Sequence, residues 1–240
     1  MSCPTDPPQR SSTGRSCYGV NMVHYYFKLK LSYNNIMPSR NVTKEQAPDS
    51  YYHVYVRGIN KQNLFNSESD YKYFIDLLER YFSDVELVSK SGGLYPSFLG
   101  KVEILSYCLM SNHFHLLVYQ IDVPYLEKFM RSLMTSYSRY LNLKNKRTGS
   151  VYESRYKAVR IISDSYLQHI SRYIHLNPKR WQRYRYSSLK YYRDGDVPHW
   201  LSTDRILEQF SSKQDYIRYI YDYQEMHDTL SELKHQLANK

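Results

Sequence analysis

The sequence predicts an α+β fold because strand-like and helix-like segments alternate between residues 51 and 176. Strands are expected at residues 51–57, 102–110, 113–119 and 157–162, and helices at residues 70–82, 125–143 and 165–176. The order is β-α-β-β-α-β with one added helix, which is the order of a ferredoxin-like split βαβ arrangement. We therefore expect an antiparallel sheet with helices on one face, an available opposite face, and a C-terminal helical extension.

The first helix has clear start and packing signals. Ser67 and Asp70 form a capping-box pattern, in which two side chains satisfy backbone N–H groups at the helix start. The apolar stripe of this helix consists of Tyr71, Phe74, Leu78 and Tyr81. We expect this stripe to pack in the core rather than to bind a cofactor.

The last helix of the core is delimited as clearly. Ser163 or Asp164 is the expected N-cap, and Pro178 ends the helix. Apolar or aromatic side chains recur at Tyr166, Ile170, Tyr173, Ile174 and Leu176.

The charge of the chain predicts a polyanionic partner. Lys and Arg number 33 against 23 acidic residues, which gives a formal charge of +10 and a pI near 9.3. Many soluble proteins are mildly basic without binding nucleic acid, but here basic and aromatic residues interleave at 155–157, 179–186 and 190–193. Cations can neutralise phosphates while flat rings stack on unpaired bases, so the pattern favours nucleic acid.

Three regions are expected along the 240 residues. Residues 1–36 form an N-terminal extension, either a flexible segment or an overlong reading of a gene that starts naturally at Met37. Residues 37–195 form the main domain, and residues 196–240 form a C-terminal helical tail with an amphipathic segment at 214–237. The tail has three candidate roles, namely packing on the core, extending a DNA-binding surface or pairing two copies.

Cysteine usage and hydropathy predict the compartment. Cys3, Cys17 and Cys108 have no paired spacing, which favours a reducing environment. No apolar stretch has the length of a membrane span, and the N-terminus lacks a secretion-signal pattern. We expect a soluble cytoplasmic protein without a membrane partner.

His113 and His115 are the first candidate site residues. They are two positions apart in an apolar strand, so both side chains point to the same face of the sheet. Two such imidazoles form half of a metal site. The spacing alone specifies little and is more often structural, so it requires a second signal.

Tyr173 and Asn177 supply that signal, because they lie one helical turn apart on the same face of a helix. An Asn177 amide oxygen can complete the coordination of a divalent ion, and the Tyr173 hydroxyl beside that ion is a nucleophile next to a Lewis acid. The structural alternatives are core packing for Tyr173 and a helix C-cap for Asn177. Tyr137 and Tyr140 are rival nucleophiles, but neither has Asn or Gln four residues further on.

Ordered motifs from about residue 38 to about residue 192 resemble the IS200-like single-tyrosine transposases, and among them the branch associated with repetitive extragenic palindromes (REP). The matching segments are residues 51–62, 64–65, 111–115, 148–157, 172–178, 187–188 and Tyr191. Ser111 departs from the family pattern, since relatives often have Pro there.

The resemblance implies that His113 and His115 are metal ligands, that Asn177 is the third protein ligand, and that Tyr173 is the nucleophile. It implies an HUH endonuclease in residues 37–195 that uses Mg²⁺ or Mn²⁺ to cleave and rejoin single-stranded or hairpin DNA through a 5′-phosphotyrosine. The expected DNA-binding residues are Arg57, Arg155, Lys157, Lys179, Arg180, Arg183 and Arg185. The protein would act as a monomer or a homodimer.

Two other functions remain open at the level of sequence. A domesticated nucleic-acid-binding protein would keep the basic surface without the chemistry, and a metal-dependent hydrolase would use the two histidines to activate water. No general base stands out, since His175 points away from Tyr173 on a helix and His169 is one turn before it.

Overall fold

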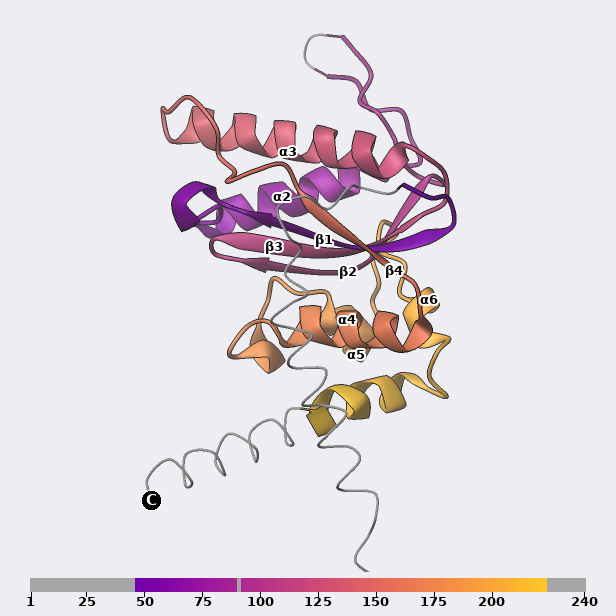
Figure 1. Cartoon of the computed structure of the whole chain (residues 1–240). Helices are drawn as coiled ribbons and strands as arrows, with labels where there is room; N and C mark the ends of the chain where they lie inside the picture. Colours follow the sequence, from indigo (N-terminus) through magenta and orange to yellow (C-terminus); the bar gives the residue numbers. More distant parts are fainter. Residues whose placement is uncertain (1–45, 90–91, 224–240) are drawn as a thin grey trace, which may run out of the picture. The chain divides into compact units, whose positions relative to one another are not determined.

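The computed structural model describes residues 46–89 and 92–223, which are built around one four-stranded antiparallel sheet (Figure 1). Its strands are β1 (Ser50–Arg57), β2 (Val102–Met110), β3 (His113–Gln120) and β4 (Lys157–Ile161). They lie in the order β2-β3-β1-β4, and every neighbouring pair is antiparallel. The predicted fold class is therefore confirmed, and the two histidines lie on a central strand.

The two long helices α2 (Glu68–Tyr81) and α3 (Tyr125–Lys144) pack side by side on one face of the sheet, as predicted (Figure 1). Phe74 of α2, Leu133 of α3 and Val54 of β1 are fully buried in the core between these layers. At the start of α2, an Asp70 carboxylate oxygen accepts a hydrogen bond from the Ser67 backbone N–H at 2.9 Å, as the capping-box pattern predicts.

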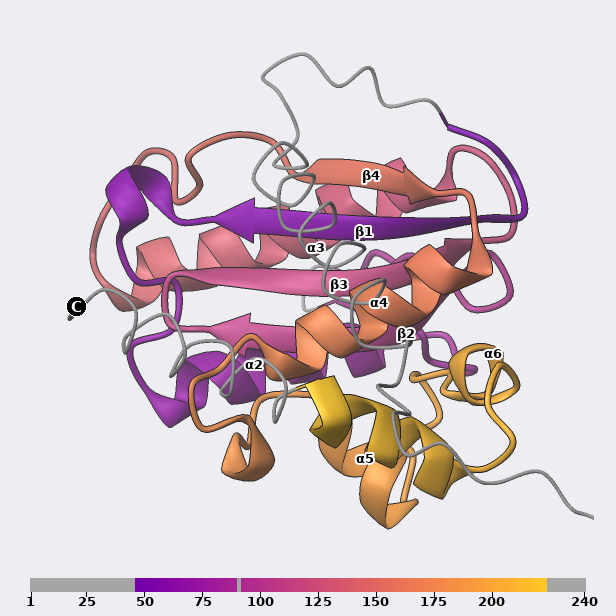
Figure 2. The same ribbon diagram turned by 60° about the horizontal axis from the view of Figure 1, so that its bottom comes forward.

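The opposite face is covered as well, which corrects the expectation that it stays available. The helices α4 (Asp164–Leu176), α5 (Leu189–Asp194) and α6 (Asp204–Leu207), together with helical residues 213–223, lie on that side (Figures 1 and 2). The reason is visible in β3, where Leu116 faces the first core and Leu117 faces a second one with Ile170 and Ile174 of α4. A strand with apolar side chains on both faces needs a cover on each.

The connections complete the description. Short 3₁₀ turns occur at η1 (Ile59–Lys61) after β1 and at η2 (Trp181–Arg183) after α4. In the tail, Tyr216 and Ile220 are buried in the second core, so residues 213–223 pack on the core, which is one of the three roles expected for the tail. The remainder of the predicted 214–237 helix and the predicted 1–36 extension lie outside the described residues. None of the described helices combines the length and apolar character needed to cross a membrane.

Candidate active site

His113 and His115 project from β3 toward the layer that contains α4. Their ring centroids are 5.2 Å apart and the rings are nearly perpendicular, so both imidazoles face the same space. His115 is 3% exposed, whereas His113, at the strand start, is half-buried. The prediction that the two side chains share a face is confirmed.

The helix α4 brings the other two predicted residues to this histidine pair (Figure 2 shows α4 across the sheet). The Asn177 Nδ2 atom is 3.5 Å from the His115 Nε2 atom, and Asn177 also forms hydrogen-bonding contacts with His113 and Tyr173. The Tyr173 ring is 5.5 Å from the His115 ring, edge to face. Four residues from two distant segments are thus gathered in one place.

Local sequence explains why α4 is held in this position. Ser163 caps the helix start by accepting a hydrogen bond from the Tyr166 N–H at 3.3 Å, and Asn177 is the C-cap residue at its end. The fully buried His175 ring is hydrogen-bonded at both nitrogens, to Tyr216 and to Ser188, each at 2.8 Å. Because His175 is buried on one side of α4, Tyr173 and Asn177 on the opposite side of the helix face the sheet.

His53 of β1 is a site residue that sequence reasoning missed. Its Nε2 atom lies 2.9 Å from the His115 Nδ1 atom, the two rings stack at 5.1 Å, and the Tyr173 ring is 6.0 Å away. Strand periodicity places His53, Tyr55 and Arg57 on one face of β1, and antiparallel pairing sets Tyr55 opposite His115 and Arg57 opposite His113. The signal was therefore the alternation within β1 combined with its register against β3.

Burial keeps the imidazoles neutral. Desolvation lowers the pKa of His53 to about 4 and lowers the pKa of His115 well below its ordinary value, where His53, His113 and Arg57 add to the effect. Burial also lowers the pKa of His113, although the contact with Asn177 partly offsets this. Neutral rings have a lone pair for a metal ion, unlike protonated ones.

The hydrogen bonds of the neutral rings indicate which ring nitrogen has the lone pair for a metal ion. His113 Nδ1 is 2.7 Å from the Asn112 side-chain oxygen, which can only accept, so Nδ1 donates and Nε2 has the lone pair. If His115 Nδ1 donates to His53, its Nε2 lone pair faces Asn177. Two imidazole nitrogens and a side-chain amide fit a divalent cation that accepts nitrogen and oxygen ligands. The described residues contain no group of three or more His, Cys, Asp or Glu side chains arranged to hold a metal.

Tyr173 is half-buried, and desolvation raises the pKa of its hydroxyl. The contact with Asn177 and the nearby Arg57 act in the opposite direction and favour the phenolate. The rival tyrosines are engaged in the core: Tyr137 donates to the Leu64 carbonyl at 2.9 Å and Tyr140 to Asp70 at 3.0 Å, both on the α2–α3 side of the sheet. Tyr173 is the one of the three that lies beside the histidines.

The predicted DNA-binding residues fall into three groups. Arg57 of β1 and Lys157 of β4 lie on the same face of the sheet as the histidines. Arg57 pairs with His113, and Lys157 pairs with Tyr55, which in turn pairs with His115. Lys179, Arg180, Arg183 and Arg185 are exposed in the segment that follows Asn177, and Arg185 pairs with Glu68 at 3.1 Å. Arg155 lines a hollow together with Glu127, Arg131 and Tyr156.

His169 is not free to act as a general base in this arrangement. Its Nδ1 atom is 2.7 Å from Arg172 and 3.2 Å from the Tyr219 hydroxyl, and burial lowers its pKa to about 4.

One family model matches part of the chain. Residues 99–177, which include His113, His115, Tyr173 and Asn177, match the family model described as "Transposase IS200 like". The resemblance predicted from the sequence is thereby confirmed over that segment, and the matched family consists of transposases, which are DNA-cleaving enzymes.

Among solved structures, the chain is similar to a REP-associated tyrosine transposase bound to a REP hairpin, with 14% identity and a TM-score of 0.47. The similarity covers 72% of this chain and 96% of the other chain. No curated protein matches the sequence.

Proposed function

We propose that this chain is a metal-dependent transposase and endonuclease that cleaves and rejoins single-stranded DNA near hairpins through a covalent phosphotyrosine. One observation supports the proposal most strongly: α4 presents Tyr173 and Asn177 to the His113–His115 pair. A tyrosine that had only a packing role would not need two neutral imidazoles and an amide around it.

In the proposed site, His113, His115 and Asn177 hold a divalent cation, Mg²⁺ or Mn²⁺. When bound, this ion supplies Lewis-acid stabilisation of negative charge on the phosphate oxygens. The role of His53 is to fix the tautomer and orientation of the His115 ring through their 2.9 Å hydrogen bond. His53 is thus a positioning residue.

Tyr173 performs the covalent step. Its hydroxyl oxygen forms a bond to the scissile phosphorus while the bond from phosphorus to the 3′-oxygen breaks, and the proton lost by Tyr173 is balanced by the proton gained at the new 3′-hydroxyl. The phosphodiester count does not change, so the reverse reaction can rejoin the strand without an external energy source. Burial keeps Tyr173 protonated before the reaction, and the Asn177 contact and Arg57 stabilise its developing charge.

Arg57 is the residue best placed to contact the phosphate. Its Nε atom is buried and has no hydrogen-bond partner among the described residues, and Arg57 lies opposite His113 in the sheet. A buried guanidinium N–H without a partner is costly, and a phosphate oxygen would satisfy it. The exposed cations after Asn177 extend this positive surface to the flanking DNA.

The experiment is a trapping assay with labelled single-stranded hairpin DNA and Mg²⁺ or Mn²⁺, followed by denaturing electrophoresis. We expect a protein–DNA adduct that resists denaturant and that disappears in Tyr173→Phe, whereas Tyr140→Phe serves as the control and keeps it. An adduct that persists in Tyr173→Phe contradicts the proposal. Cleavage without any adduct would indicate a hydrolase, and binding without cleavage a domesticated DNA-binding protein.

A further inference from the structure

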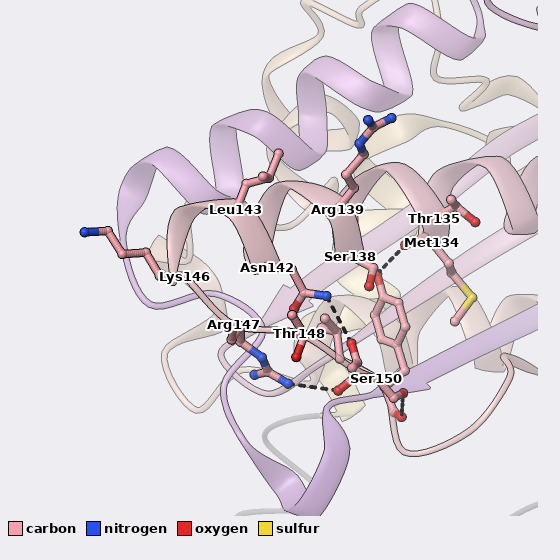
Figure 3. Close-up of a pocket in the computed structure, with 13 residues that line it drawn as sticks. Met134, Thr135, Ser138, Arg139, Asn142, Leu143, Lys146, Arg147, Thr148 and Ser150 are labelled. Carbon is pink, nitrogen blue, oxygen red and sulfur yellow. Dashed lines mark hydrogen bonds between the residues drawn. The ribbon is translucent and has the colours of Figure 1, made fainter.

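A second feature of the molecule is a cationic groove on the α2–α3 side of the sheet, here called the α3 groove (Figure 3). It has a volume of about 810 Å³ and lies between the second half of α3 and the connection to β4. Its lining residues are Met134, Thr135, Ser138, Arg139, Asn142, Leu143 and residues 146–152. The lining includes three cations, Arg139, Lys146 and Arg147, and no acidic side chain.

Two of these cations are available to a ligand. Arg139 and Lys146 are exposed, and neither forms an ion pair with any residue in the described part of the chain. Figure 3 shows both side chains extending outward, whereas Arg147 turns back to donate to the Ser150 carbonyl at 2.8 Å. The groove therefore has an unneutralised positive charge.

The walls of the groove are fixed by hydrogen bonds before any ligand binds. The Asn142 side chain donates to the Gly149 carbonyl at 3.0 Å, and the Tyr152 hydroxyl donates to the Met134 carbonyl at 3.2 Å. Gly149 has a φ of +90°, a conformation that a residue with a Cβ rarely adopts. Preformed walls reduce the entropy cost of binding.

The chemistry of the lining favours a phosphate backbone over bases. The sole aromatic side chain among the lining residues is Tyr152, which is 8% exposed, so the groove offers no ring for base stacking. Cations and the hydroxyls of Thr135, Ser138 and Thr148 suit phosphate oxygens, which carry no sequence information.

The groove also adjoins the end of the sheet that holds the active site. Its wall residue Val151 accepts from the Ile59 N–H at 3.0 Å, and the next residue but one, Glu153, donates its N–H to the Arg57 carbonyl at 3.0 Å. The Gly58 N–H in turn donates to Asn112, the neighbour of His113, at 2.9 Å. The groove wall is thus hydrogen-bonded to the end of β1 at which Arg57 lies.

We propose that the α3 groove binds the sugar–phosphate backbone of DNA that flanks the scissile phosphate, without reading its sequence. The inference rests on the proposed function for the identity of its ligand. Arg139 and Lys146 are the two contacts, and Arg147 contributes mainly to the groove wall.

The test measures the salt dependence of DNA binding with the double variant Arg139→Gln/Lys146→Gln. Each phosphate contact contributes about −0.7 to the slope of log K against log salt for single strands and about −0.9 for duplex. We expect the slope to become less steep by about 1.4 with a single-stranded flank or about 1.8 with a hairpin stem, and binding to weaken about tenfold near 0.15 M salt. Oligonucleotides that contain only the single-stranded flank or only the hairpin stem show which of the two the groove binds. When their sequences are scrambled, the double variant should reduce the salt slope by the same amount as with the original sequences.

The matched control is Lys72→Gln/Lys101→Gln, which removes the same charge from exposed residues that form no ion pair with the described residues and do not line the groove. Equal slopes for the two double variants would overturn the inference, and so would an effect limited to one DNA sequence. Adduct formation is followed in the same samples. If the wild-type chain forms no adduct, but the Arg139→Gln/Lys146→Gln variant has a less steep salt slope than wild type, only the proposed chemistry is contradicted. If the wild-type chain forms the adduct, but the two salt slopes are equal, only the proposal for the groove is contradicted.

Discussion

Replacing His53 with Phe tests whether the hydrogen-bonded His53–His115 pair organises the metal site. The substitution keeps an aromatic ring on β1 but removes the nitrogen that lies 2.9 Å from His115 Nδ1. His115 is 3% exposed, so water cannot easily replace the lost partner. We therefore expect a buried donor without a partner, and a His115 ring that is free to change its tautomer.

The magnitude follows from two independent considerations. Leaving a buried polar group unpaired costs about 1–3 kcal/mol, which is the expected loss in free energy of unfolding. Loss of the partner that orients a metal-binding histidine weakens metal affinity by about 10–100-fold, or about 1.4–2.8 kcal/mol. The affinity falls because an ion on Nε2 makes Nδ1–H a stronger donor, so the missing bond matters more in the bound state.

The assay is titration of the full chain with Mn²⁺ by calorimetry, together with urea unfolding without metal. Tyr55→Phe is the matched control, since the Tyr55 ring packs on the same imidazole at 4.9 Å, whereas the partner of Nδ1 is His53. We expect the control to bind Mn²⁺ within about twofold of wild type, because no ring nitrogen loses its partner. Wild-type affinity in His53→Phe would refute the reasoning, whatever the change in stability.

Two further predictions concern α2 and α3. Burial raises the pKa of the Asp70 carboxyl, but hydrogen bonds from Lys144, the Asn66 N–H, Tyr140 and Ser67 outweigh this effect and leave the pKa below its ordinary value. Asp70→Asn should therefore lower the free energy of unfolding by about 2 kcal/mol at neutral pH. This difference should be fully present above the pKa that Asp70 has in the unfolded chain, and it should vanish as the pH falls through the lower pKa that Asp70 has in the folded protein. A pH series of urea unfolding checks this, and a difference that persists in strong acid would contradict the assignment. Tyr137→Phe should cost about 1 kcal/mol through loss of the bond to Leu64 while adduct formation is retained, and complete loss of adduct in a folded variant would restore Tyr137 as a rival nucleophile.

Local patterns in the sequence predict most of the fold because its elements have strong local signals. The strand 102–110 is observed with the expected bounds, and α4 starts within one residue of its expected position because Ser163 and Pro178 mark its limits. By contrast, α4 was expected beside the histidines, but a layer of several helices over that whole face was not. The apolar pair Leu116 and Leu117 is the sequence signal that β3 is covered on both sides.

Site residues that are close to one another in the sequence could be predicted from local patterns. A site residue that is far from the others in the sequence could not. His113 and His115 follow from strand alternation, and Tyr173 and Asn177 from helical spacing. His53 is 62 residues from His115, so their contact depends on the register between β1 and β3. The α3 groove likewise depends on how the connection after α3 folds back, which no local pattern specifies.

The central claim is that Tyr173 is the nucleophile, and the most direct measurement is mass spectrometry of the trapped adduct. Trypsin digestion after nuclease trimming should release the peptide 173–179 with a nucleotide attached through phosphate to Tyr173. The account predicts this modification on Tyr173 in the presence of Mn²⁺ and its absence with a chelator. A nucleotide attached to any other tyrosine would contradict it.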